Sequence, residues 1–103
     1  MVKIDDGTRR YFQCANLLGH CFMMKGMPHL AQTWFKRALE TSDLHDEEIQ
    51  ALNYELAVSY EASGEKDKAF AYFEQVYALD VDYRDIGQRI QNLRESYSSS
   101  MIN

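Results

Sequence analysis

The segment LGHCFMMKG at residues 18–26 returns 38 positions later as LAVSYEASG at residues 56–64. In the same register, AQTWFKRA at residues 31–38 falls on AFAYFEQV at residues 69–76. The coinciding positions hold small residues, large apolar residues and the closing glycine, while the polar residues between them differ. Such a pattern indicates two copies of one packing unit, as in repeat architectures.

The apolar residues within each copy have helical spacing. Ala31, Phe35 and Leu39 recur every four residues, which is the stripe of an amphipathic helix. The run before this stripe ends at Gly26 in the first copy and at Gly64 in the second. Glycine adopts the left-handed backbone conformation that ends a helix at little cost. Each copy is therefore predicted to form a helix–turn–helix unit.

Seven positions in each copy share small or apolar side chains: Leu18, Gly19, Phe22, Gly26, Ala31, Phe35 and Ala38 in the first, and Leu56, Ala57, Tyr60, Gly64, Ala69, Phe73 and Val76 in the second. In this spacing they resemble the tetratricopeptide repeat (TPR) family. The signature tryptophan of that family is replaced by Ala15 and Asn53, and its proline by Asp43 and Val81. The period of 38 residues exceeds the roughly 34 of the family, which places an insertion near residues 42–48.

The resemblance implies an all-α chain, an α-solenoid of two TPR units plus a capping helix, with five helices in a right-handed superhelical stack. We expect one domain over residues 1–103, with the first repeat at about 12–45 and the second at about 46–82. A further apolar stripe at Ile86, Ile90 and Leu93 predicts the capping helix at about 83–97. The serine-rich end, residues 98–103, is expected to fray.

Composition narrows the classes of function. The formal net charge is −5 and no basic run occurs, so a nucleic-acid partner is not expected. No apolar run approaches the roughly 18 residues of a membrane span. Cys14 and Cys21 stand seven residues apart on one predicted helix, about 10 Å in rise, which is too far for a disulfide. We therefore expect free thiols and a cytoplasmic location.

The sequence offers no convincing catalytic, cofactor or metal site. His20 and Cys21 are neighbours on a helix and point about 100° apart, so they do not form a nucleophile–base pair. The acidic run of Asp80, Asp82 and Asp85 lacks the glycine and distal glutamate of a calcium-binding loop, and is expected to mark the turn into the capping helix. We therefore predict a protein that is not an enzyme and carries no cofactor.

The first helix, predicted at about residues 8–25, is apolar around most of its circumference, so more than one side of it should be covered. Three covers remain open: a preceding repeat in a longer array, a second copy of the chain in a homodimer, or a bound partner. The first is our expectation, and a tolerated apolar patch is the plainest alternative. The candidate oligomer or preceding-repeat face comprises Tyr11, Phe12, Cys14, Leu17 and Cys21.

The resemblance also implies a concave groove that holds an extended peptide, lined by the first helix of each repeat. The Lys/Asn clamp of the chaperone-binding class is absent, because Asn16, His20 and Val58 stand at its positions. A chaperone tail is therefore not the expected ligand. Transferred to this sequence, the groove comprises Gln13, Asn16, His20, Met23, Met24, Tyr54, Val58, Glu61, Gln88 and Asn92.

These observations predict a non-catalytic scaffold or adaptor that binds a peptide or partner protein. A small dimeric TPR chaperone for an export or assembly substrate is the alternative, since such proteins often dimerise through their first helices. An enzyme or its regulatory subunit is a third hypothesis, and it would require convergent polar groups that the sequence lacks.

Overall fold

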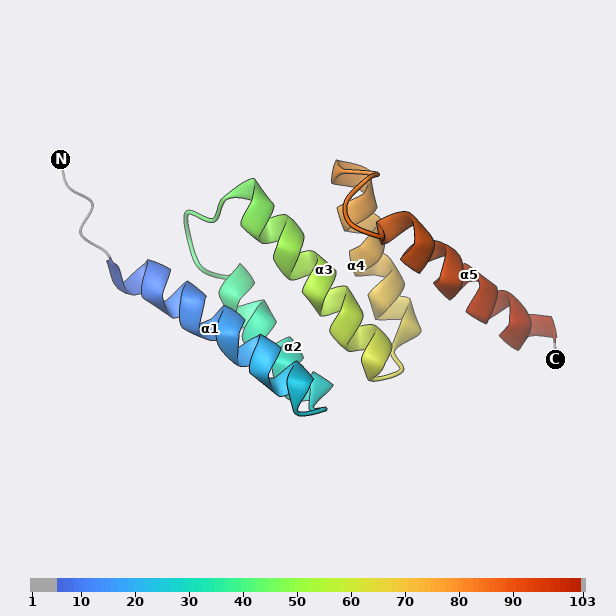
Figure 1. The fold of residues 1–103 in the computed structure, drawn as a ribbon, viewed down its shortest axis with the longest axis horizontal. Helices are drawn as coiled ribbons and strands as arrows, with labels where there is room; N and C mark the ends of the chain where they lie inside the picture. The colour runs from blue at the N-terminus through green and yellow to red at the C-terminus, as the bar shows by residue number, and fades with distance from the viewer. Residues whose placement is uncertain (1–5, 103) are drawn as a thin grey trace.

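The computed structural model describes residues 6–102, and the side chains of residues 7–96. This part of the chain is all-helical and contains no strand. Five α-helices lie side by side in one elongated row (Figure 1): α1 Asp6–Met24, α2 Pro28–Leu39, α3 Asp46–Ala62, α4 Lys66–Leu79 and α5 Ile86–Ile102. The all-α prediction and the number of helices are confirmed.

Each helix packs on its neighbour in the chain, so α1 lies on α2, α2 on α3, α3 on α4 and α4 on α5. The contacts are therefore short-range, as in a helical solenoid. Small residues at Ala31, Ala38 and Ala69 are fully buried and let the helices approach closely. The largest fully buried side chains belong to both repeats and to α5: Phe35, Phe73, Leu52, Leu56, Ile86, Leu93 and Val76.

Glycines end the first helix of each repeat, as predicted. Gly26 has φ 74° and Gly64 has φ 85°, and a Cβ built on either would meet nothing within 4 Å. Glycine is therefore required at these two positions for the backbone conformation, and not because space is short. Pro28 is the first residue of α2, where its missing N–H is no loss. Three acidic residues occupy the first turn of α3 and favour its dipole.

The inserted residues lengthen a loop, not a helix. The chain leaves α2 after Leu39 and enters α3 at Asp46, and Asp43 takes a left-handed conformation with φ 62° in between. A similar linker joins α4 to α5, with Arg84 at φ 44°. The last helix begins at Ile86 and continues to Ile102, beyond the expected end at residue 97. Asn103, the end of the expected frayed tail, lies outside the described residues.

Candidate functional site

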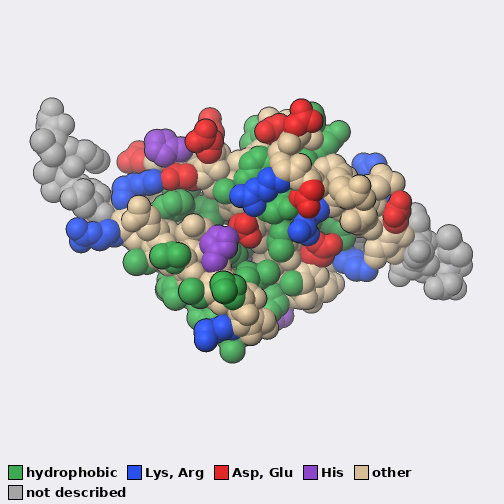
Figure 2. Space-filling model, viewed as in Figure 1, with side chains coloured by type: hydrophobic (Ala, Val, Ile, Leu, Met, Phe, Trp, Pro, Cys, Tyr) green, Lys and Arg blue, Asp and Glu red, His purple; other side chains and the backbone are tan. Residues whose placement is uncertain are grey.

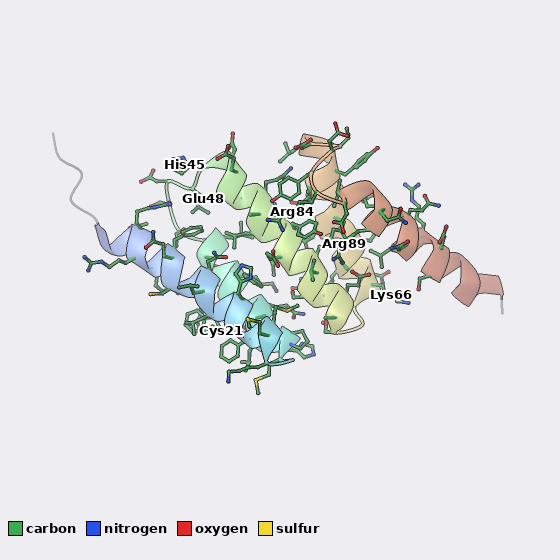
Figure 3. The ribbon with its side chains drawn as sticks, viewed as in Figure 1. Cys21, His45, Glu48, Lys66, Arg84 and Arg89 are labelled. Atoms are coloured by element: carbon green, nitrogen blue, oxygen red, sulfur yellow. The ribbon has the colours of Figure 1, made fainter. Side chains whose placement is uncertain are left out.

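The outer side of α1 carries exposed apolar side chains. Leu17 is 63% exposed and Tyr11 is 44% exposed, and Cys14 and Cys21 are exposed free thiols, of which Figure 3 labels Cys21. Phe12 does not belong to this surface: it is 7% exposed and lies in the core. Its assignment to the outer face was wrong, because it shares the inward stripe of Ala15 rather than the stripe of Cys14. We call Tyr11, Cys14, Leu17, Leu18 and Cys21 the α1 stripe.

The same stripe on α3 is covered. A shift of 38 residues places Cys14 on Leu52, Leu18 on Leu56 and Cys21 on Ser59. Leu52, Leu56 and Ser59 are at most 1% exposed. The α2 side chain of Gln32 donates from Nε2 to the carbonyl oxygen of Ser59 at 3.1 Å, which identifies α2 as the cover. The α1 stripe is therefore the uncovered equivalent of a helix-packing surface.

The residues of the predicted groove belong to α1, α3 and α5, and those of α1 are accessible. Gln13 and Met24 are exposed, and Asn16, His20 and Met23 are half-buried. The His20 ring contacts the edge of Phe35, with ring centroids 5.3 Å apart. Figure 2 shows apolar side chains gathered over the lower part of α1 and α2, whereas acidic and basic side chains mix where α3 meets α5.

The α3 and α5 part of the groove is occupied by contacts within the chain. Tyr54 is 6% exposed, so its assignment as a groove contact was wrong: its hydroxyl donates to Asp85 and accepts from Arg89 Nε at 2.9 Å. Val58 is half-buried and packs against the core. The remaining predicted groove residues also have partners in the chain: Glu61 pairs with Arg89 Nη1 at 3.0 Å, and Gln88 donates to Asn92 at 3.0 Å.

A network of charges between α3 and the start of α5 was not predicted from the sequence. Arg84 pairs with Glu55 at 3.4 Å, and its guanidinium lies 4.8 Å from the centroid of the Tyr54 ring (Figure 3). Burial and the hydrogen bond to Asp85 raise the pKa of Tyr54, and the same bond lowers the pKa of Asp85. These partners lie 28 to 35 residues apart, so no local pattern indicated the network.

A second charged contact joins α1 to the start of α3. The guanidinium of Arg9 donates to both carboxylate oxygens of Glu48, one of them at 3.1 Å. Glu48 Oε1 also accepts from the backbone N–H of His45 at 2.9 Å, immediately before α3 (Figure 3). The hydrogen bond from Arg9 is the main cause that lowers the pKa of Glu48 to about 2.

Within the described residues, no three or more His, Cys, Asp or Glu side chains come together in a way that could hold a metal ion. Asp80, Asp82 and Asp85 lie in and beside the turn before α5, where Asp80 accepts from the backbone N–H of Asp82 at 3.0 Å. None of the described helices combines the length and apolar character needed to cross a membrane.

Comparison with known proteins gives one family. A family model described as "Tetratricopeptide repeat" matches residues 51–82, which include most of α3 and all of α4. The search of curated proteins found no match to this chain. The matched segment is the second copy of the 38-residue repeat, and α1 and α2 have the same helix–turn–helix form.

Proposed function

The chain is a tetratricopeptide-repeat protein, and from that premise we propose that it is a non-catalytic protein-binding module whose main contact surface is the α1 stripe. Repeats of this family are protein–protein interaction modules. Of the two candidate surfaces, we propose the α1 stripe, and not the predicted groove, as the main contact surface.

The observation that carries this choice is the difference in exposure between matching stripes. Cys14 is exposed and Leu18 is half-buried on α1, while the matching Leu52 and Leu56 on α3 are at most 1% exposed. Removing apolar surface from water stabilises a complex by about 25 cal/mol per Å². A helix that packs on α1 as α2 packs on α3 is therefore the expected partner element.

The groove is a secondary surface in this proposal. Its α1 residues, such as Asn16 and His20, are accessible, but Tyr54 is buried and Glu61 is already paired with Arg89. An acidic peptide ligand would have to compete with Glu55 and Glu61 for the two arginines. We expect the protein to act in the cytoplasm, where the exposed thiols of Cys14 and Cys21 stay reduced.

The alternative function is a small dimeric TPR chaperone for an export or assembly substrate. The same observation favours it, because two α1 stripes could face one another in a two-fold symmetric dimer. The two functions differ in the occupant of the stripe: a second copy of the chain for the chaperone, and a different protein for the binding module.

The test is the solution mass measured by light scattering over a range of concentrations, for the natural chain and for Leu17→Glu. Glutamate is the natural residue at the matching position of α3, Glu55, so the variant should fold. Val81→Glu, at a site 55% exposed in the linker before α5, is the matched control.

A dimer that Leu17→Glu dissolves and Val81→Glu retains would favour the chaperone. A monomer is expected for the binding module, and photo-crosslinking from position 17 in cells should then trap a partner that position 81 does not. A monomer that gives the same crosslinks from both positions would contradict a binding role for the α1 stripe.

A further inference from the structure

Two surface pockets occupy equivalent places in the two repeats, where the start of the first helix meets the end of the second. The first-repeat pocket, of about 460 Å³, is lined by Thr8 and Tyr11 of α1 and by residues 37–42. The second-repeat pocket, of about 430 Å³, is lined by α3 and by the end of α4. A shift of 38 residues places Thr8 on Asp46 and Tyr11 on Ile49. The two pockets therefore form a natural matched pair.

The second-repeat pocket is acidic and has apolar walls. Three carboxylates, Asp46, Glu47 and Asp80, belong to its lining, together with Ile49 and Leu79. The first-repeat pocket has Arg37 in its lining, whereas no basic residue lines the second. Asp80 also caps the C-terminus of α4, the end at which a helix dipole favours positive charge.

A buried and incompletely satisfied glutamine distinguishes the second-repeat pocket further. Gln50 lines it, is 6% exposed, and donates from Nε2 to the carbonyl oxygen of Val76 at 3.0 Å. Because a carbonyl oxygen can only accept, the amide nitrogen must face Val76 and the amide oxygen must face away. Among the described side chains, Gln50 Oε1 is the buried polar atom without a hydrogen-bond partner. Such an acceptor is costly to leave unpaired, so a donor entering the pocket would be favoured.

The repeat pattern does not account for a glutamine at position 50. The matching residue of the first repeat is Phe12, an apolar core residue. Arg84, next to the lining residue Tyr83, is already paired with Glu55 at 3.4 Å. The second-repeat pocket thus combines negative charge, an unused acceptor and apolar walls.

We propose that the second-repeat pocket binds an arginine side chain of a partner protein. Carboxylates around an apolar wall suit a side chain with a long apolar stem and a cationic end. The guanidinium has five N–H donors in a planar fork, enough to bond to several of the carboxylates at once and to Gln50 Oε1 when the Gln50 side chain turns this buried oxygen into the pocket. The ammonium of lysine has three donors and no planar face, so arginine binds more tightly.

This inference relies on the proposed function only in taking the partner to be a protein. The second-repeat pocket lies where the start of α3 meets the end of α4, and none of its lining residues belongs to the α1 stripe. A failure of the Leu17→Glu test therefore leaves the pocket proposal standing, and the reverse also holds.

The test is a titration of the isotope-labelled chain with N-acetyl-arginine methylamide, followed by nuclear magnetic resonance. The expected result is saturable shifts of the Gln50 side-chain amide and of backbone amides in residues 46–50 and 79–83, with a dissociation constant on the order of 1 mM. The neutral citrulline analogue, which has the same length, should produce no saturable shift. The amides around the first-repeat pocket, residues 7–12 and 37–42, should not respond.

Two variants sharpen the test. Glu47→Gln combined with Asp80→Asn removes two charges without changing side-chain size, and should weaken binding about tenfold. Glu40→Gln, in the lining of the first-repeat pocket, is the matched control and should leave binding unchanged. Gln50→Met retains length and removes the unpaired oxygen, and should also weaken binding. Unchanged spectra elsewhere will report that each variant folds.

Several outcomes would overturn the proposal. These are equal binding of the citrulline analogue, an equal response at both pockets, or no saturable shift at ten times the expected dissociation constant. Full retention of binding in the doubly substituted variant would also overturn it. If light scattering shows a dimer and the doubly substituted variant is a monomer, the arginine in the pocket belongs to a second copy of the chain and not to another protein.

Discussion

The first repeat, α1–α2, and the second repeat, α3–α4, place matching residues at matching positions but bury them differently. Leu56 is fully buried while its counterpart Leu18 is only half-buried, and Leu52 is 1% exposed while Cys14 is exposed. The second repeat lies between α2 and α5, whereas among the described residues α1 packs on α2 and meets α3 through Arg9 and Glu48. In a stack of repeats, the burial of a side chain depends on the neighbouring unit as much as on its own repeat.

The small residues at matching positions, Gly19 and Ala57, indicate closer helix packing in the first repeat than in the second. A Cβ built on Gly19 would lie 2.4 Å from the Phe35 ring, so the first repeat requires glycine there. The second repeat has Ala57 at this position, and Ala57 and Phe73, the residue that matches Phe35, are both fully buried. The helices of the first repeat are therefore packed more closely at this point, although one of them is less covered.

The largest expected effect comes from the two matching phenylalanines. Phe73→Ala should lower the free energy of unfolding by about 3–5 kcal/mol, because the residue is fully buried and its ring contacts Tyr54 edge-on. Phe35→Ala should mainly destabilise the packing of α1, which can then unfold separately, since a terminal unit of a stack can unfold by itself. Urea denaturation followed by circular dichroism should give one lowered transition for Phe73→Ala and two separate transitions for Phe35→Ala.

Identical single transitions for both variants would contradict the expectation that α1 unfolds separately from the rest of the stack. A loss below about 1 kcal/mol for Phe73→Ala would contradict its place in the core.

The next effect concerns the small residues at matching positions, Gly19 and Ala57. Gly19→Ala should cost about 1–3 kcal/mol, because the added methyl group overlaps the rigid Phe35 ring. Ala57→Gly in the second repeat should cost about 1–2 kcal/mol, through helix propensity and the loss of one buried methyl group. Thermal unfolding of the two single variants measures both. A Gly19→Ala variant as stable as the natural chain would show that the two repeats are packed equally closely.

A smaller effect is expected where the first helix of each repeat ends. Gly26→Ala and Gly64→Ala should each cost about 1 kcal/mol, because both glycines have positive φ. Gly87→Ala is the matched control: Gly87 lies in α5, has no crowding atom within 4 Å, and should stabilise the chain by about 0.5–1 kcal/mol. Differential scanning calorimetry should therefore give melting temperatures that move in opposite directions. A rise for either Gly26→Ala or Gly64→Ala would contradict the left-handed turn.

The repeat, the helix ends and the buried small residues could be predicted because they depend on local spacing. The periodicity at Phe35 and the glycine at Gly26 each report on a single turn of chain. Phe12 and Tyr54 were misplaced for a different reason: a helical pattern identifies stripes, but not which stripe a neighbouring helix covers.

The charged network could not be predicted for a related reason. Arg84 and Arg89 meet Glu55 and Glu61 only because α5 turns back beside α3. The direction of that turn depends on the linker, in which Arg84 itself takes a left-handed conformation. The unpaired oxygen of Gln50 depends on the distance between α3 and α4 in the same way.

The smallest effect tests the contact that ties the first repeat to the second. The pKa of Glu48 is lowered to about 2 in the folded chain by its hydrogen bond from Arg9, against an ordinary value of 4.5. The unfolded chain therefore binds the proton more readily, and the stabilisation is fully present above about pH 4.5 and is lost as the pH falls toward 2. Glu48→Gln should lower the melting temperature slightly at pH 6 and leave it unchanged near pH 2. Because Arg9 is partly exposed, the difference should also shrink in high salt. A difference in melting temperature that persists at low pH would contradict a role for the charge of Glu48 and so its pairing with Arg9, because glutamine can still accept the hydrogen bond from His45; the two repeats would then be joined by packing alone.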